Sequence, residues 1–186
     1  MRDKVAHVPE LTLSATVDHI NNAVRKLSQL RIASLFGKDA STVRLYRGIR
    51  GELPPTIAPD DHGLLCFTDY GFMSTSCDIA TPLQYMGAGE SNLLWEIQVR
   101  EQDVAHHMGA DVSQISQYPA EREILFPPMT MLNVRMRDGN ADDGEAAARR
   151  TGDWRSRFHL HLGEPGHNAD GDEVRYDRFE VLPFFV

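Results

Sequence analysis

The chain has 186 residues, of which 41% are hydrophobic and 25% charged, a composition typical of a globular protein with one folded domain. Its 27 acidic and 19 basic residues leave a formal net charge of −8, which argues against a general nucleic-acid binder because such proteins neutralise phosphates with basic side chains. No apolar run approaches the roughly 20 residues that a membrane-spanning helix needs, so we expect no membrane span.

The first predicted element is a helix. Residues 1–13 have no regular period and are expected to form an irregular arm. From Ser14 to about residue 36, apolar residues recur every three or four positions, which predicts an amphipathic helix packed against a sheet. Gly37 is the expected end of this helix. The apolar stripe consists of Val17, Ile20, Val24, Leu27 and Leu30.

Beyond Gly37 the sequence has the alternating pattern of strands. The predicted strands cover residues 43–49, 71–76, 93–99, 124–126, 132–136, 157–162 and 179–186. A loop is expected at residues 54–63, and a short helix is expected to start at Thr81-Pro82, with Pro82 at its first position, and to end near Gly87 or Gly89. Residues 138–153 are polar and glycine-rich, which predicts a mobile insertion. Because strands and helices do not alternate, we expect an α+β fold in which two small sheets pack together and the first helix lies outside.

Arg47 interrupts the apolar register of the first predicted strand. It shares a strand face with Val43, Leu45 and Ile49, where a permanently charged guanidinium needs an anionic partner. That partner is either a protein carboxylate in a buried ion pair or a bound anion. The next residue, Gly48, has no side chain and would let a ligand approach the backbone closely.

Two further polar features follow in the chain. Residues 74–76 are Ser-Thr-Ser in the middle of a predicted strand, where hydroxyl groups bind neighbouring side chains or a ligand, or simply mark an edge strand. Glu121 and Glu123 lie two positions apart at the start of another strand, so they are expected to project to the same side. Such a pair is either a solvated charged turn or two carboxylates that face one cleft.

Taken together, these three features suit one type of reaction. An interior arginine would hold an anionic phosphate, one carboxylate would stabilise a sugar cation, and the second carboxylate would activate an incoming nucleophile. Glycosyl transfer divides the work between two carboxylates in this way.

The same features carry a resemblance to a known family. The motifs LYRG at 45–48, GFMSTS at 71–76 and AEREILFPP at 120–128 resemble, in this order, the mono-ADP-ribosyltransferases of the Arg–Ser–Glu class. The last motif is most similar to those of the vertebrate ecto-enzymes and the arginine-specific bacterial toxins. The resemblance covers about residues 40–136 and, more loosely, the last strand. The disulfide cysteines usual in the vertebrate enzymes have no counterpart here.

The resemblance implies a single ADP-ribosyltransferase domain over residues 1–186, with two roughly perpendicular antiparallel sheets that enclose an NAD cleft. It also implies the reaction, which is transfer of ADP-ribose from NAD to an arginine side chain of an acceptor protein with release of nicotinamide. NAD is then the co-substrate, and no metal is required.

The resemblance also implies roles for individual residues. Arg47 would contact the NAD phosphates and the nicotinamide ribose, and the Gly48 backbone would hold the nicotinamide carboxamide. Ser74 would orient Glu123, the catalytic glutamate that binds the ribose 2′-hydroxyl and stabilises the oxocarbenium ion. Glu121 would select and activate the acceptor guanidinium.

Four other residues complete the expected site. Thr75 and Ser76 would support the NAD cleft, and Tyr85, by its position after the serine motif, would stack on nicotinamide. Tyr118 lies three residues before Glu121, where arginine-specific toxins carry an aromatic side chain that faces the acceptor.

Two other functions remain open from the sequence: an NAD glycohydrolase that uses the same cleft, and a non-catalytic module of the same fold that binds NAD or a protein. His159 and His161 share a strand face, but the opposite face is apolar as in any exposed strand, so we expect no metal site. The N-terminal sequence shows no export signal, and Cys66 and Cys77 form no disulfide framework. The compartment is unassigned, with the cytosol favoured and a secreted effector as the alternative, and we expect a monomer.

Overall fold

The computed structural model describes residues 13–35, 42–53, 58–100, 109–135 and 158–184. The predicted arm at residues 1–13, apart from its last residue, and the predicted insertion at 138–153 lie outside these residues. The elements are α1 (Ser14–Leu35), β1 (Thr42–Arg50), β2 (Leu65–Asp69), β3 (Met73–Ser76), α2 (Ala80–Gln84), β4 (Asn92–Arg100), β5 (Ala110–Asp111), a 3₁₀ turn (Pro119–Glu121), β6 (Glu123–Phe126), β7 (Thr130–Val134), β8 (His159–His167) and β9 (Glu173–Phe184). No helix in these ranges is both long and apolar enough to cross a membrane.

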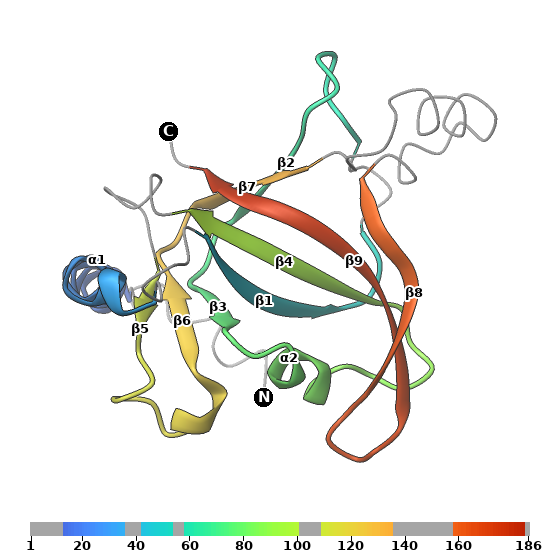
Figure 1. The fold of residues 1–186 in the computed structure, drawn as a ribbon. Coiled ribbons are helices and arrows are strands. Elements are labelled where there is room, and N and C mark those ends of the chain that lie inside the picture. The colour runs from blue at the N-terminus through green and yellow to red at the C-terminus, as the bar shows by residue number, and fades with distance from the viewer. Residues whose placement is uncertain (1–12, 36–41, 54–57, 101–108, 136–157, 185–186) are drawn as a thin grey trace, which may run out of the picture.

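The strands form one continuous hydrogen-bonded path in the order β2-β7-β9-β4-β1-β3-β6-β5, and β8 pairs with β9 off this path (Figure 1). The prediction of two antiparallel sheets therefore needs two corrections. The path is unbroken, and β4 and β9 run parallel, from Leu93 opposite Asp177 to Ile97 opposite Val181. The parallel pairing arises at the long strand β9, which pairs with β4 along one edge and with β8 and β7 along the other.

The pairing between neighbouring strands is shortest between β1 and β3. These strands share a single residue pair, Tyr46 opposite Ser76, whereas β1 pairs with β4 at every residue from Thr42 to Arg50. Figure 1 shows β5 and β6 running in a different direction from β4 and β9. One pair of residues therefore joins two groups of strands that point in different directions.

The main core fills one side of the sheet. It is built from the side chains of Leu45, Met73, Leu93, Trp95, Ile97, Phe126, Leu132, Phe158, Phe179 and Val181, with smaller residues between them. The opposite side of β4 is buried as well, because Leu94 packs with Met86, Val174 and Tyr176. The predicted alternation of β4 is confirmed, but its second face is not open to solvent, and Glu96 is only 3% exposed.

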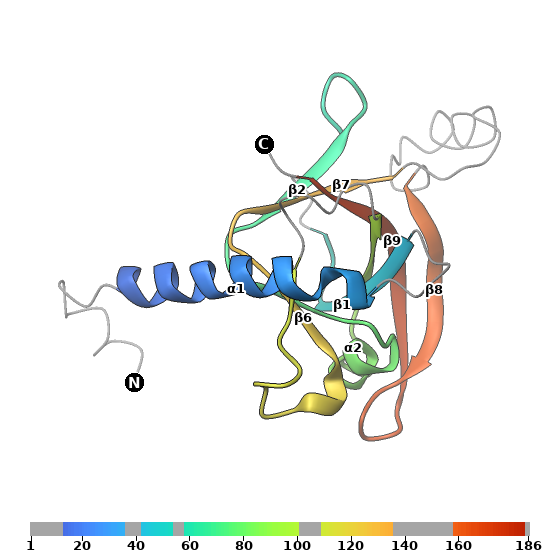
Figure 2. The ribbon, with the colours of Figure 1, turned by 60° about the vertical axis from the view of Figure 1, so that its left-hand side comes forward.

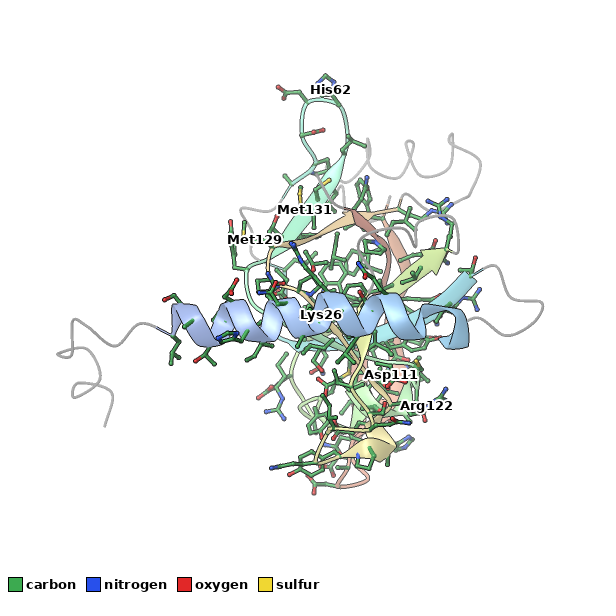
Figure 3. The ribbon with its side chains drawn as sticks, turned by 90° about the vertical axis from the view of Figure 1, so that its left-hand side faces the viewer. Lys26, His62, Asp111, Arg122, Met129 and Met131 are labelled. Carbon is green, nitrogen blue, oxygen red and sulfur yellow. The ribbon has the colours of Figure 1, made fainter. Side chains whose placement is uncertain are left out.

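Helix α1 begins and ends where the sequence predicts, from Ser14 to Leu35. Val24 is buried and packs with Leu27 on Ala110 and Val112 of the β5 region. The first part of the stripe is not covered, because Val17 is 42% and Ile20 is 40% exposed. Figure 2 shows the N-terminal turns of α1 projecting past the sheet, and Figure 3 shows Lys26 on the outer side of this helix.

Helix α2 differs from its prediction at both ends. It starts at Ala80 and stops at Gln84, so Pro82 is its third residue and the helix ends before Gly87. Near this start, Asp78 Oδ1 accepts a hydrogen bond from the Ala80 N–H at 2.9 Å. The short strands β2 and β5 have no counterpart in the prediction.

A buried ion network connects β1, β4 and β9. Glu96 of β4 accepts hydrogen bonds from Arg178 of β9, one of them from Nε at 2.9 Å, and pairs with Arg44 of β1 at 3.0 Å. Arg178 also lies 3.5 Å from Glu164. Glu96 is the most buried of these charged groups, so its burial is tolerated only because two guanidinium groups face it.

This network predicts a large loss of stability for Glu96→Ala. The change leaves the half-buried Arg178 without its main partner, so we expect the free energy of unfolding to fall by about 3 kcal/mol. Urea denaturation followed by circular dichroism measures this difference. Glu173→Ala is the matched control, because Glu173 and Arg175 form an exposed pair with side chains 56% and 67% exposed. We expect a change below about 1 kcal/mol there, and equal losses in the two variants would contradict the assignment.

Candidate active site

The three polar features of the sequence meet in one cleft. Its volume is about 230 Å³, and it lies between the β1–β3 junction, α2 and the start of β6. The cleft is lined by Tyr46, Arg47, Gly48, Ser74, Thr75, Ser76, Thr81, Pro82, Tyr85, Glu121 and Glu123. All the site residues expected from the sequence are in this set except Tyr118.

Ser74 and Glu123 form the closest contact between the two motifs. Ser74 lies opposite Leu125 in the β3–β6 pairing, so Glu123 is its diagonal neighbour across the strands. The Ser74 hydroxyl donates to Glu123 Oε1 at 2.5 Å, a short bond as expected for a charged acceptor. The hydrogen bond fixes one oxygen of a carboxylate that begins β6.

The hydroxyl groups of Thr75 and Ser76 form hydrogen bonds with backbone groups and do not project freely into the cleft. The Thr75 hydroxyl is buried and donates to the Ile124 carbonyl at 2.7 Å. The Ser76 hydroxyl donates to the Glu121 carbonyl at 2.6 Å and accepts from the Asp78 N–H at 2.9 Å. The hydroxyl run therefore holds the segment that carries both glutamates in place against β3.

Arg47 has the anionic partner that the sequence requires. Its Nη2 lies 3.0 Å from Asp69 Oδ2, and its Nη1 donates to the Ser74 carbonyl at 2.9 Å. The Arg47 side chain is 27% exposed, so part of the guanidinium still faces the cleft. The sequence analysis missed Asp69 because the strand that ends with it, β2, is too short to show a clear alternation.

Glu121 and Glu123 reach the same cleft by a different route from the one predicted. Glu121 ends the 3₁₀ turn and is not part of β6, and Arg122 between them has a left-handed backbone with φ of 50° and ψ of 49°. The period-two argument is therefore wrong, although both carboxylates line the cleft. Figure 3 shows Arg122 on the same side of the molecule as Asp111. Burial raises the pKa of the nearby Cys77 thiol, while the charge of Arg122 lowers it and that of Asp111 raises it.

Tyr85 contacts Glu121 directly. Its hydroxyl donates to Glu121 Oε1 in a short hydrogen bond, while 56% of the residue is exposed. This hydrogen bond is the main cause of a raised pKa of the Tyr85 phenol, and the negative charge of Glu121 adds to it. Tyr118 does not line the cleft and is 64% exposed, and its phenol makes a smaller contribution in the same direction to the pKa of Tyr85.

Gly48 is a glycine for a reason that the sequence analysis did not consider. A Cβ at this position would lie 3.1 Å from both Pro82 Cβ and the Pro82 carbonyl oxygen, and 3.3 Å from Met86 Cε. Most of the room that a side chain would need is already filled by α2. Gly48 also lines the cleft, and the approach of a ligand to its backbone stays a prediction.

Two other cavities are larger than this cleft. One of about 370 Å³ shares Arg47 with it and has Phe67, Trp95 and Asp69 in its wall. Another, of about 520 Å³, contains Arg175 and four carboxylates, Glu52, Glu90, Glu173 and Asp177. A polyanion is unfavourable there, because the acidic groups outnumber the one arginine. In the described part of the chain no His, Cys, Asp and Glu side chains gather into a group that could hold a metal, and the side chains of His159 and His161 lie outside it.

Comparison with known proteins connects part of the chain to one family. Residues 65–149 match the model of the ADP-ribosyltransferase exoenzyme family. The matched segment contains β2, the Ser-Thr-Ser strand and the glutamate pair, and it starts after Arg47. No curated protein matches the chain.

Several solved structures are similar to the chain. The ADP-ribosyltransferase HopU1 of Pseudomonas syringae is 18% identical with a TM-score of 0.47, over 96% of this chain and 58% of that one. Plx2a, an ADP-ribosyltransferase toxin from Paenibacillus larvae, is 16% identical with a TM-score of 0.47, over 94% and 74%. Exoenzyme S from Pseudomonas aeruginosa, solved with a human 14-3-3 protein and carba-NAD, is 19% identical with a TM-score of 0.38, over 88% and 66%. The chain thus spans about three fifths of the length of HopU1.

The contact between Tyr85 and Glu121 predicts that the pKa of Tyr85 depends on the charge of Glu121. Glu121→Gln removes the charged acceptor, so the pKa of Tyr85 should fall from its raised value toward the ordinary value of 10.0. The pKa should fall, and not rise, because the Glu121 carboxylate stabilises the protonated form of the phenol. Carbon NMR of the tyrosine Cζ against pH measures the shift.

Glu164→Gln is the matched control for this titration. It removes a carboxylate that, after desolvation by burial, helps to raise the pKa of Tyr176. The pKa of Tyr85 should stay at its raised value in this variant. A Tyr85 pKa that is the same in Glu121→Gln and in the parent protein would contradict the hydrogen bond.

Proposed function

We propose that the protein transfers ADP-ribose from NAD to an arginine side chain of an acceptor protein and releases nicotinamide. The observation that carries this proposal is the placement of two carboxylates, Glu121 and Glu123, with Arg47 and Ser74 in one cleft. The family match over residues 65–149 supports the class of reaction. The choice of arginine as acceptor rests on the Glu-x-Glu arrangement.

The cleft fits one end of a dinucleotide. At about 230 Å³ it is smaller than the roughly 300–1,000 Å³ of typical small-molecule sites, so it holds a part of NAD and not the whole molecule. The neighbouring cavity of about 370 Å³ is also lined by Arg47. Together, the two volumes fall within the range of typical small-molecule sites. Arg47 therefore lies between the two spaces, where a guanidinium can bind a pyrophosphate.

Glu123 is the group that stabilises positive charge. Bound NAD supplies ADP-ribose, whose bond from C1′ to the cationic nicotinamide breaks with both electrons leaving on nicotinamide, now neutral. The Glu123 carboxylate offers negative charge to the sugar as this bond breaks. The Ser74 hydroxyl holds Glu123 Oε1 in place, so little reorganisation is needed during the reaction.

Glu121 is the group that faces the acceptor. A protonated guanidinium is a poor nucleophile, and a carboxylate beside it both orients it and accepts a proton as its nitrogen forms the new bond to C1′. Ser76 fixes the backbone carbonyl of Glu121, and Tyr85 binds its carboxylate. Tyr118 precedes Glu121 by three residues and is 64% exposed, so it is available to contact an acceptor protein.

Substitutions of the two glutamates should have different effects on NAD hydrolysis and on transfer to an acceptor. Glu123→Gln is expected to lower both NAD hydrolysis and transfer by at least about 100-fold, because charge stabilisation is lost. Glu121→Gln is expected to lower transfer to a guanidine acceptor by a similar factor and to affect hydrolysis far less. Nicotinamide release with and without agmatine, together with detection of ADP-ribosyl-agmatine, measures both activities.

The outcomes of this assay separate three functions. ADP-ribosyl-agmatine formed by the parent protein supports the proposal. Nicotinamide release without that product would identify a glycohydrolase or a different acceptor. Absence of NAD consumption would favour a binding module, and full transfer by Glu121→Gln would show that Glu121 has another role.

The hydrogen bond of Ser74 gives a separate prediction. Ser74→Ala removes a bond to a charged acceptor, so we expect kcat for NAD consumption to fall about 10- to 100-fold. Ser91→Ala is the matched control, since its hydroxyl donates to Glu52 Oε1 at 2.9 Å outside the cleft. Steady-state kinetics of nicotinamide release measures both variants. An unchanged kcat in Ser74→Ala would mean that Glu123 does not need this bond.

A further inference from the structure

The carboxylate of Glu121 is held by a residue that comes from a different part of the fold. Glu121 lies at the end of a 3₁₀ turn, where its backbone carbonyl accepts from Ser76 at 2.6 Å. Its side chain would still rotate freely without a second contact. The hydroxyl of Tyr85, which comes directly after α2, provides that contact at Oε1.

Tyr85 is fixed independently of Glu121. Its N–H donates to the Pro82 carbonyl at 3.2 Å, and its carbonyl accepts from Arg50 Nε at 2.6 Å. Arg50 is the last residue of β1, so the strand that carries Arg47 also holds the backbone of Tyr85. The backbone of Tyr85 is therefore anchored on β1 and α2 by hydrogen bonds that do not involve Glu121.

The hydrogen bond leaves Glu121 able to bind a cation. A phenol is uncharged, so the carboxylate keeps its negative charge, which an arginine or lysine partner would neutralise. Within the described part of the chain, Oε2 of Glu121 accepts no hydrogen bond. A carboxylate that is held at Oε1 and open at Oε2 can still meet the parallel N–H groups of a guanidinium.

We propose that Tyr85 is a positioning residue that orients Glu121 toward the acceptor guanidinium, with Arg50 holding Tyr85 in place. This inference rests on the proposed transfer to arginine. The expectation that the Tyr85 ring stacks on nicotinamide stays a separate prediction, because the contact with Glu121 involves only the hydroxyl. The role is specific to the acceptor, because Tyr85 touches Glu121 and has no hydrogen bond to Glu123 in the described residues.

The test compares Tyr85→Phe with Tyr176→Phe in the full chain. Tyr85→Phe keeps the exposed ring and removes only the hydroxyl. Tyr176→Phe likewise removes a hydroxyl that is hydrogen-bonded to a carboxylate, Glu164, and Tyr176 lines neither the cleft nor the neighbouring cavity. For Tyr85→Phe we expect the ratio of agmatine transfer to NAD hydrolysis to fall about tenfold, with most of the change in kcat/KM for agmatine. Tyr176→Phe should keep the ratio of the parent protein.

Arg50→Ala provides a second, independent variant. It removes the bond to the Tyr85 carbonyl, so we expect a smaller fall in the same ratio. If Arg50 acts through Tyr85, the double variant should lose no more than Tyr85→Phe alone. Independent, additive losses would overturn the role of Arg50.

Each outcome has a distinct meaning for the role of Tyr85. If the parent protein forms ADP-ribosyl-agmatine and Tyr85→Phe keeps the parent ratio, the positioning role is overturned and the proposed function stands. If Tyr85→Phe lowers transfer and hydrolysis equally, Tyr85 acts on NAD and the role is also overturned. If the parent protein forms no ADP-ribosyl-agmatine, the proposed function fails, and this inference fails with it.

Discussion

The site depends on the single residue pair that joins β1 to β3, Tyr46 opposite Ser76. A longer ladder would force the two strands to run together, and the side chains beyond the pair would meet in a closed sheet. With one pair, the strands separate at once. Arg47 then reaches the Ser74 carbonyl from one strand, while the serine hydroxyls face the start of β6 from the other. The cleft is the space that this divergence leaves.

Charge is arranged around this junction so that no group is left unpaired at high cost. Asp69 faces Arg47, the hydroxyls of Ser74 and Tyr85 face the two glutamates, and Glu96 is paired on the opposite side of the sheet. The glutamates receive neutral donors, whereas the arginine and Glu96 receive full counter-charges. The two glutamates therefore keep their negative charge at the positions where a cation is expected, while the charges of Arg47 and Glu96 are neutralised by their partners.

Much of the fold could be predicted from local patterns. The limits of α1, β1 and β4 follow from periodicity, and the motif residues do gather in one cleft, whereas Tyr118 does not line it. The contacts that support the site could not be predicted. Asp69 and Tyr85 reach their partners across 22 and 36 positions of the chain, and no local pattern records such pairings. The parallel pairing of β4 with β9 was not predicted for the same reason, since strand order depends on non-local contacts.

The close packing of Gly48 against Pro82 connects the two ends of the cleft mechanically. A Cβ at Gly48 would require a small shift of Pro82 in α2, and α2 leads directly into Tyr85. A displacement that begins beside the expected nicotinamide position is thus passed through a rigid proline to the tyrosine that holds Glu121. A substitution at Gly48 would therefore disturb the acceptor side of the reaction as well as the NAD side, although no atom of Gly48 is hydrogen-bonded to Glu121.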